Sequence, residues 1–429
     1  MRIRNLTLAL AVFMLLSAPA LADAPAASMR AGMRTGAQLT GQFYFALQRW
    51  ATKHGALFEG MRWFPGDFNG DGLHEFAVVW NDGGEISIDV HKSTGSSFVL
   101  ERWETRQGAL LPGMTWFAGD FTGDGKDELA VQWDDAGAIS ADVHVSTGSA
   151  FVKQRWATQL SGVVEGAQWF AGDFDGDGKR DLAEAFDDGG RRSISVHKST
   201  GSAFVHARWA TKHSWWYAGS WYAPIGWFPD DFDGDGKDDL AIVVNDHDQI
   251  TIEVERSSGS AFVLEFWAIK QGALFEGMLW FPGDFTGDGK DELAVVWNDL
   301  DQITIDVHAS SGSAFVPERW ATKQGALFGG MLWFPGDFNG DGKQELAVVW
   351  NDGGQISIDV HASTGGAFAM QRWATKQGNL IDGMLWFVAD CNGDGRDDLA
   401  NRWDDAGMIS MDVQVAAVRH VAYVPLIVR

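Results

Sequence analysis

Seven acidic loops form the pattern in this sequence that most directly indicates chemistry. Each follows D-x-[N/T/D]-G-D-G-x-x-[D/E], and the copies begin at Asp67, Asp120, Asp173, Asp231, Asp284, Asp337 and Asp390. Successive copies are 53 residues apart, except for one separation of 58 residues. Calcium prefers six to eight oxygen ligands from a flexible loop, and acidic side chains at alternating positions of a turning loop converge on one point. The loops therefore predict cation sites.

The ligands of each site follow from position in the loop. Positions 1, 3 and 5 offer side-chain oxygens, position 7 offers its carbonyl, and an acid at position 9 completes the shell. The candidates are Asp67, Asn69, Asp71, Leu73 and Glu75; Asp120, Thr122, Asp124, Lys126 and Glu128; Asp173, Asp175, Asp177, Lys179 and Asp181; Asp231, Asp233, Asp235, Lys237 and Asp239; Asp284, Thr286, Asp288, Lys290 and Glu292; Asp337, Asn339, Asp341, Lys343 and Glu345; and Asp390, Asn392, Asp394, Arg396 and Asp398. We expect up to seven calcium ions, held more weakly where Thr122 and Thr286 supply neutral oxygens.

Two other interpretations of the loops fit the sequence less well. An EF-hand needs Glu at position 12 and flanking helices, whereas position 12 of the first loop is Val78, inside a predicted strand. Metal-free Asx turns use Asp and Asn to bond their own backbone, but such turns need no acid at position 9. Three or four carboxylates in each loop would also repel one another without a counter-ion.

The segments around each loop read as four short strands. In the first copy, residues 61–66, 76–80, 85–91 and 98–103 are apolar or alternate with period two, and Gly-rich turns separate the last three of them. Four strands in a repeat of about 50 residues are typical of a propeller blade. We predict an all-β fold, a seven-bladed β-propeller of four-stranded antiparallel blades.

The two ends of the repeat predict how the ring closes. The last copy lacks a fourth strand, and residues 45–50 (FALQRW) match the fourth strand of the first copy, residues 98–103 (FVLERW). The N-terminal strand should therefore complete the seventh blade and remove an open sheet edge. The alternative is that residues 413–429 add their own outer strand.

The N-terminus reads as a bacterial Sec-type signal peptide over residues 1–22, with basic residues, an apolar run and an A-L-A cleavage site. Residues 23–40 are expected to form a flexible leader and residues 41–429 the propeller, in a secreted, extracellular or periplasmic protein. The apolar run is too short to span a membrane. A net charge of −25 argues against nucleic acid as a partner. The single cysteine, Cys391, allows no intrachain disulfide and is expected to be buried and inert.

The loops lie in the longer motif W-F-x-G-D-F-[N/T/D]-G-D-G-x-x-[D/E]-L-A. This motif resembles the FG-GAP/VCBS repeats of integrin alpha-subunit propellers, and seven such blades resemble the calcium-containing fungal propeller lectins of the Psathyrella velutina type. The resemblance covers residues 41–429 and implies the fold and the metal. It implies less about function, because the fold hosts adhesion, glycan binding and scaffolding.

Ligand binding is expected on the face opposite the metal loops, where the turn between strands 2 and 3 meets the long connector between blades. The resembled families carry their ligands there, and Trp, Asn, Asp, Lys and Gln on this face could stack on and hydrogen-bond a sugar. The candidates are Trp80, Asp82, Trp133, Asp135, Trp297, Asp299, Trp350, Asp352, Trp403 and Asp405. The same residues could instead pack between blades and form ordinary hairpin turns.

An inserted connector of aromatic residues explains the one longer separation. It contains Trp215, Trp216, Tyr217, Trp221 and Tyr222. This segment could be a specific binding loop, or a plug between the two most divergent blades.

No catalytic motif accompanies these features. Five histidines recur in register on the third strand, namely His91, His144, His197, His308 and His361, and a group copied in five blades favours a structural hydrogen-bonding role. We expect a secreted, non-catalytic binding protein for a glycan or cell-surface ligand. The alternatives are an adhesion or scaffold protein with a protein partner, and a polysaccharide lyase or hydrolase with its site near residues 215–222.

Overall fold

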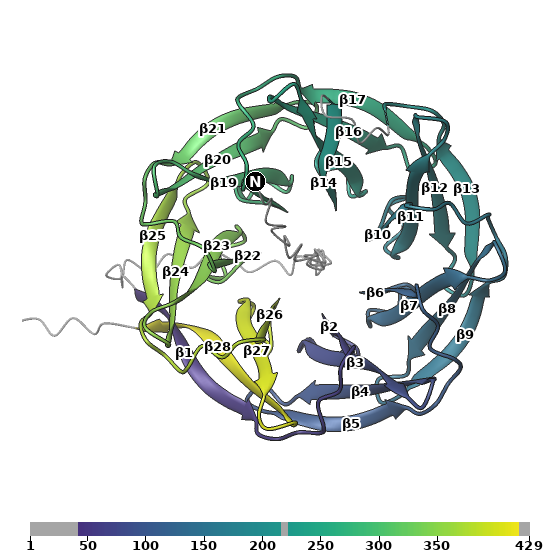
Figure 1. The fold of residues 1–429 in the computed structure, drawn as a ribbon, viewed down its shortest axis with the longest axis horizontal. Helices are drawn as coiled ribbons and strands as arrows, with labels where there is room; N and C mark the ends of the chain where they lie inside the picture. Colours follow the sequence, from purple (N-terminus) through teal and green to yellow (C-terminus); the bar gives the residue numbers. More distant parts are fainter. Residues whose placement is uncertain (1–41, 216–221, 420–429) are drawn as a thin grey trace, which may run out of the picture.

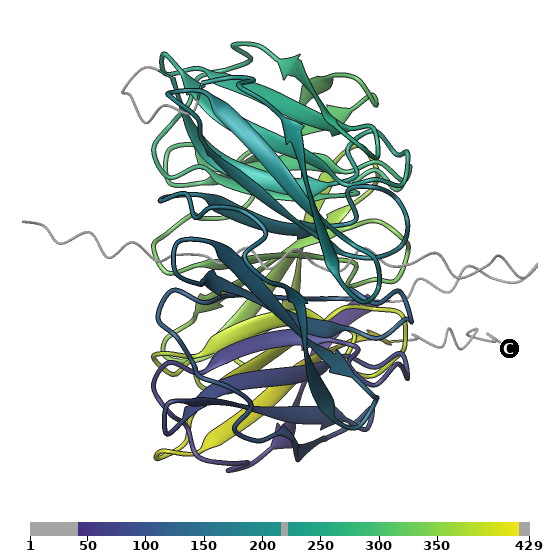
Figure 2. The same ribbon diagram turned by 90° about the vertical axis from the view of Figure 1, so that its right-hand side faces the viewer.

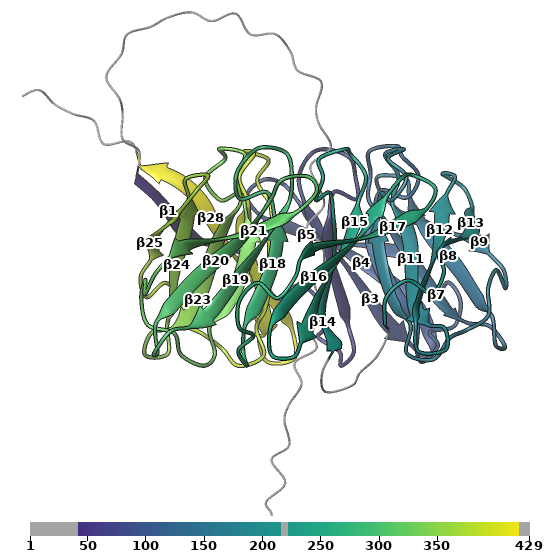
Figure 3. The same ribbon diagram turned by 90° about the horizontal axis from the view of Figure 1, so that it is seen from above.

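The strands of the protein form a ring of seven sheets around a central axis (Figure 1). A computed structural model describes residues 42–215 and 222–419. Within these residues, 28 strands form seven antiparallel sheets of four strands each. Seen from the side, the ring is a disc with loops on both faces (Figures 2 and 3). The predicted seven-bladed β-propeller is confirmed.

The blades are numbered in chain order, each with its innermost strand first. Blade 1 contains β2 (Arg62–Gly66), β3 (Glu75–Asp82), β4 (Glu85–Ser93) and β5 (Phe98–Glu104); blade 2 contains β6 (Thr115–Gly119), β7 (Glu128–Asp134), β8 (Ile139–Ser146) and β9 (Phe151–Ala157); and blade 3 contains β10 (Gln168–Gly172), β11 (Asp181–Asp187), β12 (Arg192–Ser199) and β13 (Phe204–Ala210). Blade 4 contains β14 (Tyr222–Asp230), β15 (Asp239–Asp246), β16 (Ile250–Ser257) and β17 (Phe262–Ala268); blade 5 contains β18 (Leu279–Gly283), β19 (Glu292–Asn298), β20 (Ile303–Ser310) and β21 (Phe315–Ala321); and blade 6 contains β22 (Leu332–Gly336), β23 (Glu345–Asn351), β24 (Ile356–Ser363) and β25 (Phe368–Ala374).

Blade 7 joins the two ends of the chain. Its strands are β26 (Leu385–Ala389), β27 (Asp398–Asp404), β28 (Ile409–Arg419) and β1 (Gln42–Ala51), in that order from the centre outward. β1 pairs antiparallel with β28, so that Phe45 lies opposite Ala416. The ring is therefore closed by the N-terminal strand. The alternative outer strand is not formed by the described part of residues 413–429, because that part continues β28, the third strand of the blade.

The core lies between neighbouring blades rather than within one sheet. Each hydrophobic cluster combines residues of consecutive blades; one joins Phe64 and Val79 of blade 1 to Trp116 and Val131 of blade 2. Both faces of each inner strand are thus covered, which explains the continuous apolar runs of the second strands, such as FAVVW. Cys391 is fully buried in this core, as expected from its place in the loop.

The recurring histidines serve packing more than hydrogen bonding. His91 stacks on Trp63 with 5.2 Å between ring centroids, and the His in four other blades repeats this contact with the equivalent Trp. Among the described residues, neither ring nitrogen of His91 or His361 has a hydrogen-bond partner. The expected hydrogen-bonding role therefore does not hold for these two, because they lie against indole rings in the core.

The metal loops and the turns between strands 3 and 4 share one face. The hydroxyl of Ser199, at the end of β12, donates a hydrogen bond of 2.6 Å to the carbonyl of Phe121 in the loop of the preceding blade. Five other blades repeat this bond. Successive loops are also joined through their backbones, for example from Asp127 N to Asp67 O at 2.9 Å. This network ties each blade to the next around the metal-loop face.

Candidate functional site

Acidic side chains converge in the loops of the first five blades. Among the residues described, each of these loops brings one ligand atom from each of three acids within 4.8 Å of one another. The groups are Asp67, Asp71 and Glu75; Asp120, Asp124 and Glu128; Asp173, Asp175 and Asp181; Asp231, Asp233 and Asp239; and Asp284, Asp288 and Glu292. The loops at Asp337 and Asp390 have the same sequence pattern but not this convergence. The structure therefore shows five acidic clusters that could hold a metal ion.

The first residue of each loop fixes the local turn. In blade 1, the Asp67 carboxylate accepts hydrogen bonds from the backbone N–H groups of Gly70 at 2.7 Å and Gly72 at 2.9 Å. Both glycines adopt positive φ, 76° and 82°, which an L side chain adopts only with strain. In blade 1 the turn brings the acids at positions 1, 5 and 9 together.

The acid at position 9 is buried in every loop. Glu75 accepts a hydrogen bond from Phe68 N at 3.1 Å and is fully inaccessible to solvent. Burial, and after it the neighbouring Asp67 and Asp71, raises its pKa to about 9. Burial likewise raises the pKa of the equivalent acids to about 8 for Glu128, Asp181, Asp239, Glu292 and Asp398 and to about 9 for Glu345.

These pKa values follow from burial and from repulsion between the carboxylates, which together outweigh a nearby cation such as Lys92. Asp181 Oδ2 and Asp239 Oδ2 are buried and accept no hydrogen bond from the described residues. The cations at position 7 lie elsewhere, since Lys179 pairs with Asp177 at 2.6 Å, at position 5 of the same loop. A divalent cation would offset this repulsion and would use the orphaned oxygens, so the donor set fits one.

On the opposite face, the faces of the repeated tryptophan rings are covered. The guanidinium of Arg102 lies 4.8 Å from the centroid of Trp80, and the ring of Phe58 stacks on the same indole at 5.2 Å. Arginine lies in the same way over Trp133, Trp297, Trp350 and Trp403. The aromatic ring that stays exposed on this face is therefore not the tryptophan but the phenyl ring of Phe58, on the connector between blades. Sequence reasoning missed Phe58, although its position in the repeated G-A-L-F motif was a visible signal.

The candidate acids of the turns on this face make local contacts. Asp82 pairs with Arg106 at 2.9 Å. The other ion pairs are Lys323 with Asp299 and Lys376 with Asp352, both at 3.5 Å, and Lys53 with Asp405 at 3.9 Å. Asp135 accepts a hydrogen bond from Ser140 Oγ at 2.8 Å. Each acid thus helps to connect its turn to a neighbouring strand or to the following connector, and all five lie at the face that also carries the exposed phenyl rings.

The inserted connector is described only in part. Trp215 is 54% exposed and lies under the guanidinium of Arg191 at 4.8 Å. The residues before it enter the space between blades 3 and 4, where His213 Nδ1 lies 2.7 Å from Glu255 Oε2. Trp216, Tyr217 and Trp221 lie outside the described residues, and Tyr222 begins β14.

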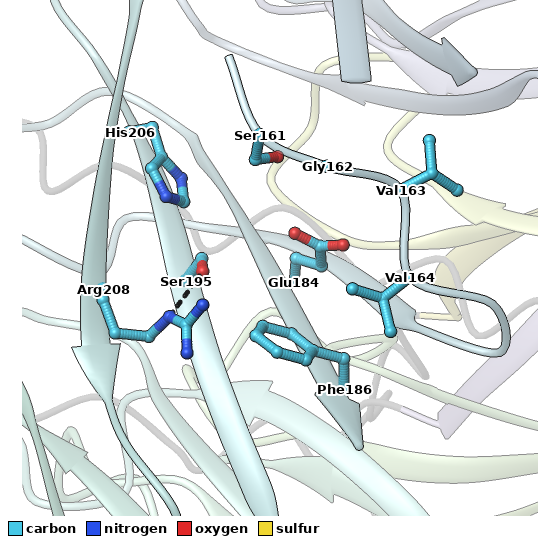
Figure 4. A pocket seen from close by; sticks show the side chains of 9 residues that line it. All are labelled: Ser161, Gly162, Val163, Val164, Glu184, Phe186, Ser195, His206 and Arg208. Carbon is cyan, nitrogen blue, oxygen red and sulfur yellow. Dashed lines mark hydrogen bonds between the residues drawn. The ribbon is translucent and has the colours of Figure 1, made fainter. Parts of the chain in front are cut away.

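Two hollows lie between blades near the connectors. One of about 370 Å³ is lined by Ile225, Asn245, Asp248 and residues 274–278, between blades 4 and 5. The other, of about 330 Å³, lies between blades 2 and 3 and is lined by residues 161–164 and by side chains of β11, β12 and β13 (Figure 4). Both are of a size that can take a small molecule.

Solved structures share this fold at low sequence identity. No family model matches the chain, and no curated protein matches its sequence. A lectin from Agrocybe aegerita that specifically recognises non-reducing terminal N-acetylglucosamine is 16% identical, with a TM-score of 0.56 over 76% of this chain and 81% of the lectin. The class of the protein is therefore that of the β-propellers.

Polysaccharide lyases resemble the chain less closely. An oligogalacturonate lyase in complex with manganese is 11% identical, with a TM-score of 0.47 over 88% of this chain and 98% of the lyase. A Bacillus licheniformis rhamnogalacturonan lyase is 16% identical, with a TM-score of 0.40 over 86% of this chain and 72% of the lyase. In the described residues, we find no helix long and apolar enough to cross a membrane.

Proposed function

We propose that the protein is a secreted, calcium-stabilised propeller that binds carbohydrate without catalysing a reaction. The observation that carries this proposal is the hollow between blades 4 and 5, where Phe275, 49% exposed, lies beside Asn245, Asp248 and Glu276. An aromatic ring packs against the apolar face of a sugar, and amide and carboxylate groups bind its hydroxyls.

The same aromatic position recurs around the ring. Phe58 is 47% exposed and Phe328 is 43% exposed, each in contact with the tryptophan of its blade. Weak equivalent sites on one face would act together on a branched or repeating glycan, since multivalent binding raises the effective affinity. The lectin of similar fold supports a sugar as the ligand class.

Calcium is the cation that we propose for the acidic loops. The donors are carboxylates, amides, hydroxyls and carbonyls, which suit a hard cation rather than one that prefers thiolate or imidazole. When bound, calcium would supply structural cross-linking within a loop rather than chemistry. An exported protein would meet calcium in abundance, and the sequence of residues 1–22 supports export.

A protein-binding adhesion role is the second candidate. The exposed apolar side chains of the connectors include Leu111 and Ile381 as well as the phenyl rings, so they recur in most blades. A recurring apolar face can also bind a protein surface.

Substituting the three exposed phenyl rings tests the carbohydrate proposal. We expect Phe58→Ala, Phe275→Ala and Phe328→Ala together to weaken binding to immobilised glycans at least tenfold. The matched control replaces Val152, Val205 and Val316, which are equally exposed on the outer strands, by Ala. The control should bind within about twofold of the original protein. Equal binding by both variants would place the ligand elsewhere and contradict the proposal for this face.

A further inference from the structure

At the interface between blades 2 and 3, several side chains are smaller than those at the equivalent positions of other blades. Phe186 stands where blades 1 and 2 have Trp80 and Trp133, and Val164 stands where blade 1 has Phe58. Ala167 likewise replaces Met61. Phe186 and Val164 both line the cavity of about 330 Å³ at this interface.

The same interface also departs from the repeat in polarity. Glu184 stands where blade 1 has Val78, and His206 stands where it has Leu100. Register pairs Glu184 with Ser195 across β11 and β12, and Ser195 with Arg208 across β12 and β13. The changes at Glu184, Phe186 and His206 therefore fall on one face of blade 3, which points towards blade 2.

Three residues that line this cavity each have a buried polar atom without a hydrogen-bond partner among the described residues. These atoms are Ser161 Oγ on the connector, Glu184 Oε1 on β11 and His206 Nδ1 on β13. Glu184 is only 2% exposed, and its carboxylate lies among the other residues that line the cavity (Figure 4). Buried carboxylates are ordinarily hydrogen-bonded, which indicates that this one is arranged for a donor from a ligand.

Arg208 lacks the direct carboxylate contact of its equivalents. In blade 1, Arg102 bonds directly to Asp89, but blade 3 has Ser195 at the Asp89 position. Arg208 Nε donates to Ser195 Oγ at 3.1 Å, and the nearest carboxylate oxygen, on Asp188, is 3.9 Å from its Nη1. The guanidinium lies 4.5 Å from the centroid of Phe186, which holds it at the edge of the cavity. It can therefore donate to an acceptor in the cavity.

We propose that this cavity is a binding site for one uncharged sugar residue, formed where blade 3 departs from the residue types of blade 1. The inference rests on the carbohydrate-binding function proposed above. A hydroxyl group can donate to Glu184 and also accept from Arg208, whereas a carboxylate cannot donate and an ammonium cannot accept. Val163, Val164 and Phe186 supply an apolar wall for the C–H groups of the ring.

His206 completes the donor and acceptor set. Burial, and after it the neighbouring His197, lowers the pKa of His206, so its imidazole is neutral at pH 7. A neutral imidazole has one donor and one acceptor nitrogen, which matches a hydroxyl group again.

Restoring the repeat in blade 3 tests the site without disturbing the fold. The variant carries Glu184→Val, Ser195→Asp and His206→Leu, the residue types of blade 1. Calorimetric titration would use galactose and N-acetylglucosamine, with galacturonate and glucosamine as charged probes. The intact protein should bind a neutral sugar, and the restored variant should have one site fewer per chain. Glu184→Gln, which keeps the shape, should weaken that site at least tenfold.

Two controls separate this inference from the proposed function. Lys153 of blade 2 occupies the repeat position that His206 occupies in blade 3. Lys153→Leu therefore makes the equivalent change in another blade and should leave the number of sugar-binding sites per chain unchanged. The variant without Phe58, Phe275 and Phe328 should keep the blade 3 site. The same site count in the restored and intact proteins, or preference for a charged probe, would overturn the inference alone. Failure of every glycan to bind the intact protein would overturn both proposals.

Discussion

The buried histidines make the stability of the fold depend on acid. Burial, with a further contribution from His54, lowers the pKa of His91 to about 3, and burial lowers that of His308 and His361 to about 4. The pKa in the unfolded chain is about 6.5. Each ring is therefore neutral in the folded state and takes up a proton on unfolding below pH 6.5. The stabilisation is present above pH 6.5 and is lost as the pH falls towards 4.

We predict that His91→Gln reduces this acid sensitivity. Glutamine is the residue at the same position of blade 7, where Gln414 is fully buried. Each histidine contributes up to about 1.4 kcal/mol of lost stability per pH unit in this range. Urea unfolding at pH 6.5 and pH 4.5 should show a smaller loss for the variant than for the original protein. An identical loss would mean that His91 is not neutral in the fold.

At the residue scale, the sequence predicted the acidic clusters of the loops better than it predicted the contacts among side chains on the candidate ligand face. The loops could be found because their donors lie within nine consecutive residues, where spacing alone determines geometry. The contact of Phe58 with Trp80, and of Arg102 with the same indole, joins three segments of the chain. Such contacts depend on how a connector crosses the neighbouring blade, so the pattern within one strand did not predict them.

At the scale of elements, blades 3 and 4 are joined by a buried ionic cluster. Arg192 is almost fully buried and lies 2.6 Å from Glu255 and 2.8 Å from Glu253 on β16. Ser214, just before the inserted connector, donates a hydrogen bond to Glu253, and His213 contacts Glu255. The start of the insertion is therefore anchored in this interface.

We predict that Arg192→Met lowers the free energy of unfolding by about 3–5 kcal/mol, because it leaves two buried carboxylates without their cation. Arg191→Met is the matched control, since Arg191 covers the exposed ring of Trp215, and it should change stability by about 0.5 kcal/mol or less. Chemical denaturation measures both. A loss as small as that of the control would show that the cluster does not hold the two blades together.

The sequence also predicted most elements, for a physical reason. In each blade, period-two alternation or an apolar run lies between Gly-rich turns, and the first-blade strands begin and end within two residues of the expected limits. The identity of the outer strand of blade 7 remained open, since two segments at opposite ends of the chain could have filled it. Pairing of β1 with β28 is a tertiary contact, and the sequence match of FALQRW to FVLERW was the signal for it.

At the scale of the whole molecule, calcium should stabilise the closed ring. An ion that binds only the folded state raises its stability, by about 2.7 kcal/mol for each site when the free ion is at 100 times Kd. We predict that calcium raises the melting temperature and that a chelator reverses the rise. Glu75→Ala removes the buried acid of one loop and should reduce the rise, while magnesium at equal concentration should have less effect. The same melting temperature with calcium and with chelator would contradict calcium as a structural ion.

Carbohydrate binding by the connector face is the central claim, and a glycan array measures it most directly. The intact propeller would be applied once with calcium and once with chelator. We predict binding to a restricted set of glycans in calcium, and weaker binding in chelator because the loops that hold the blades together lose their ions. Absence of binding to any glycan in either condition would contradict the account and would favour a protein partner for this face.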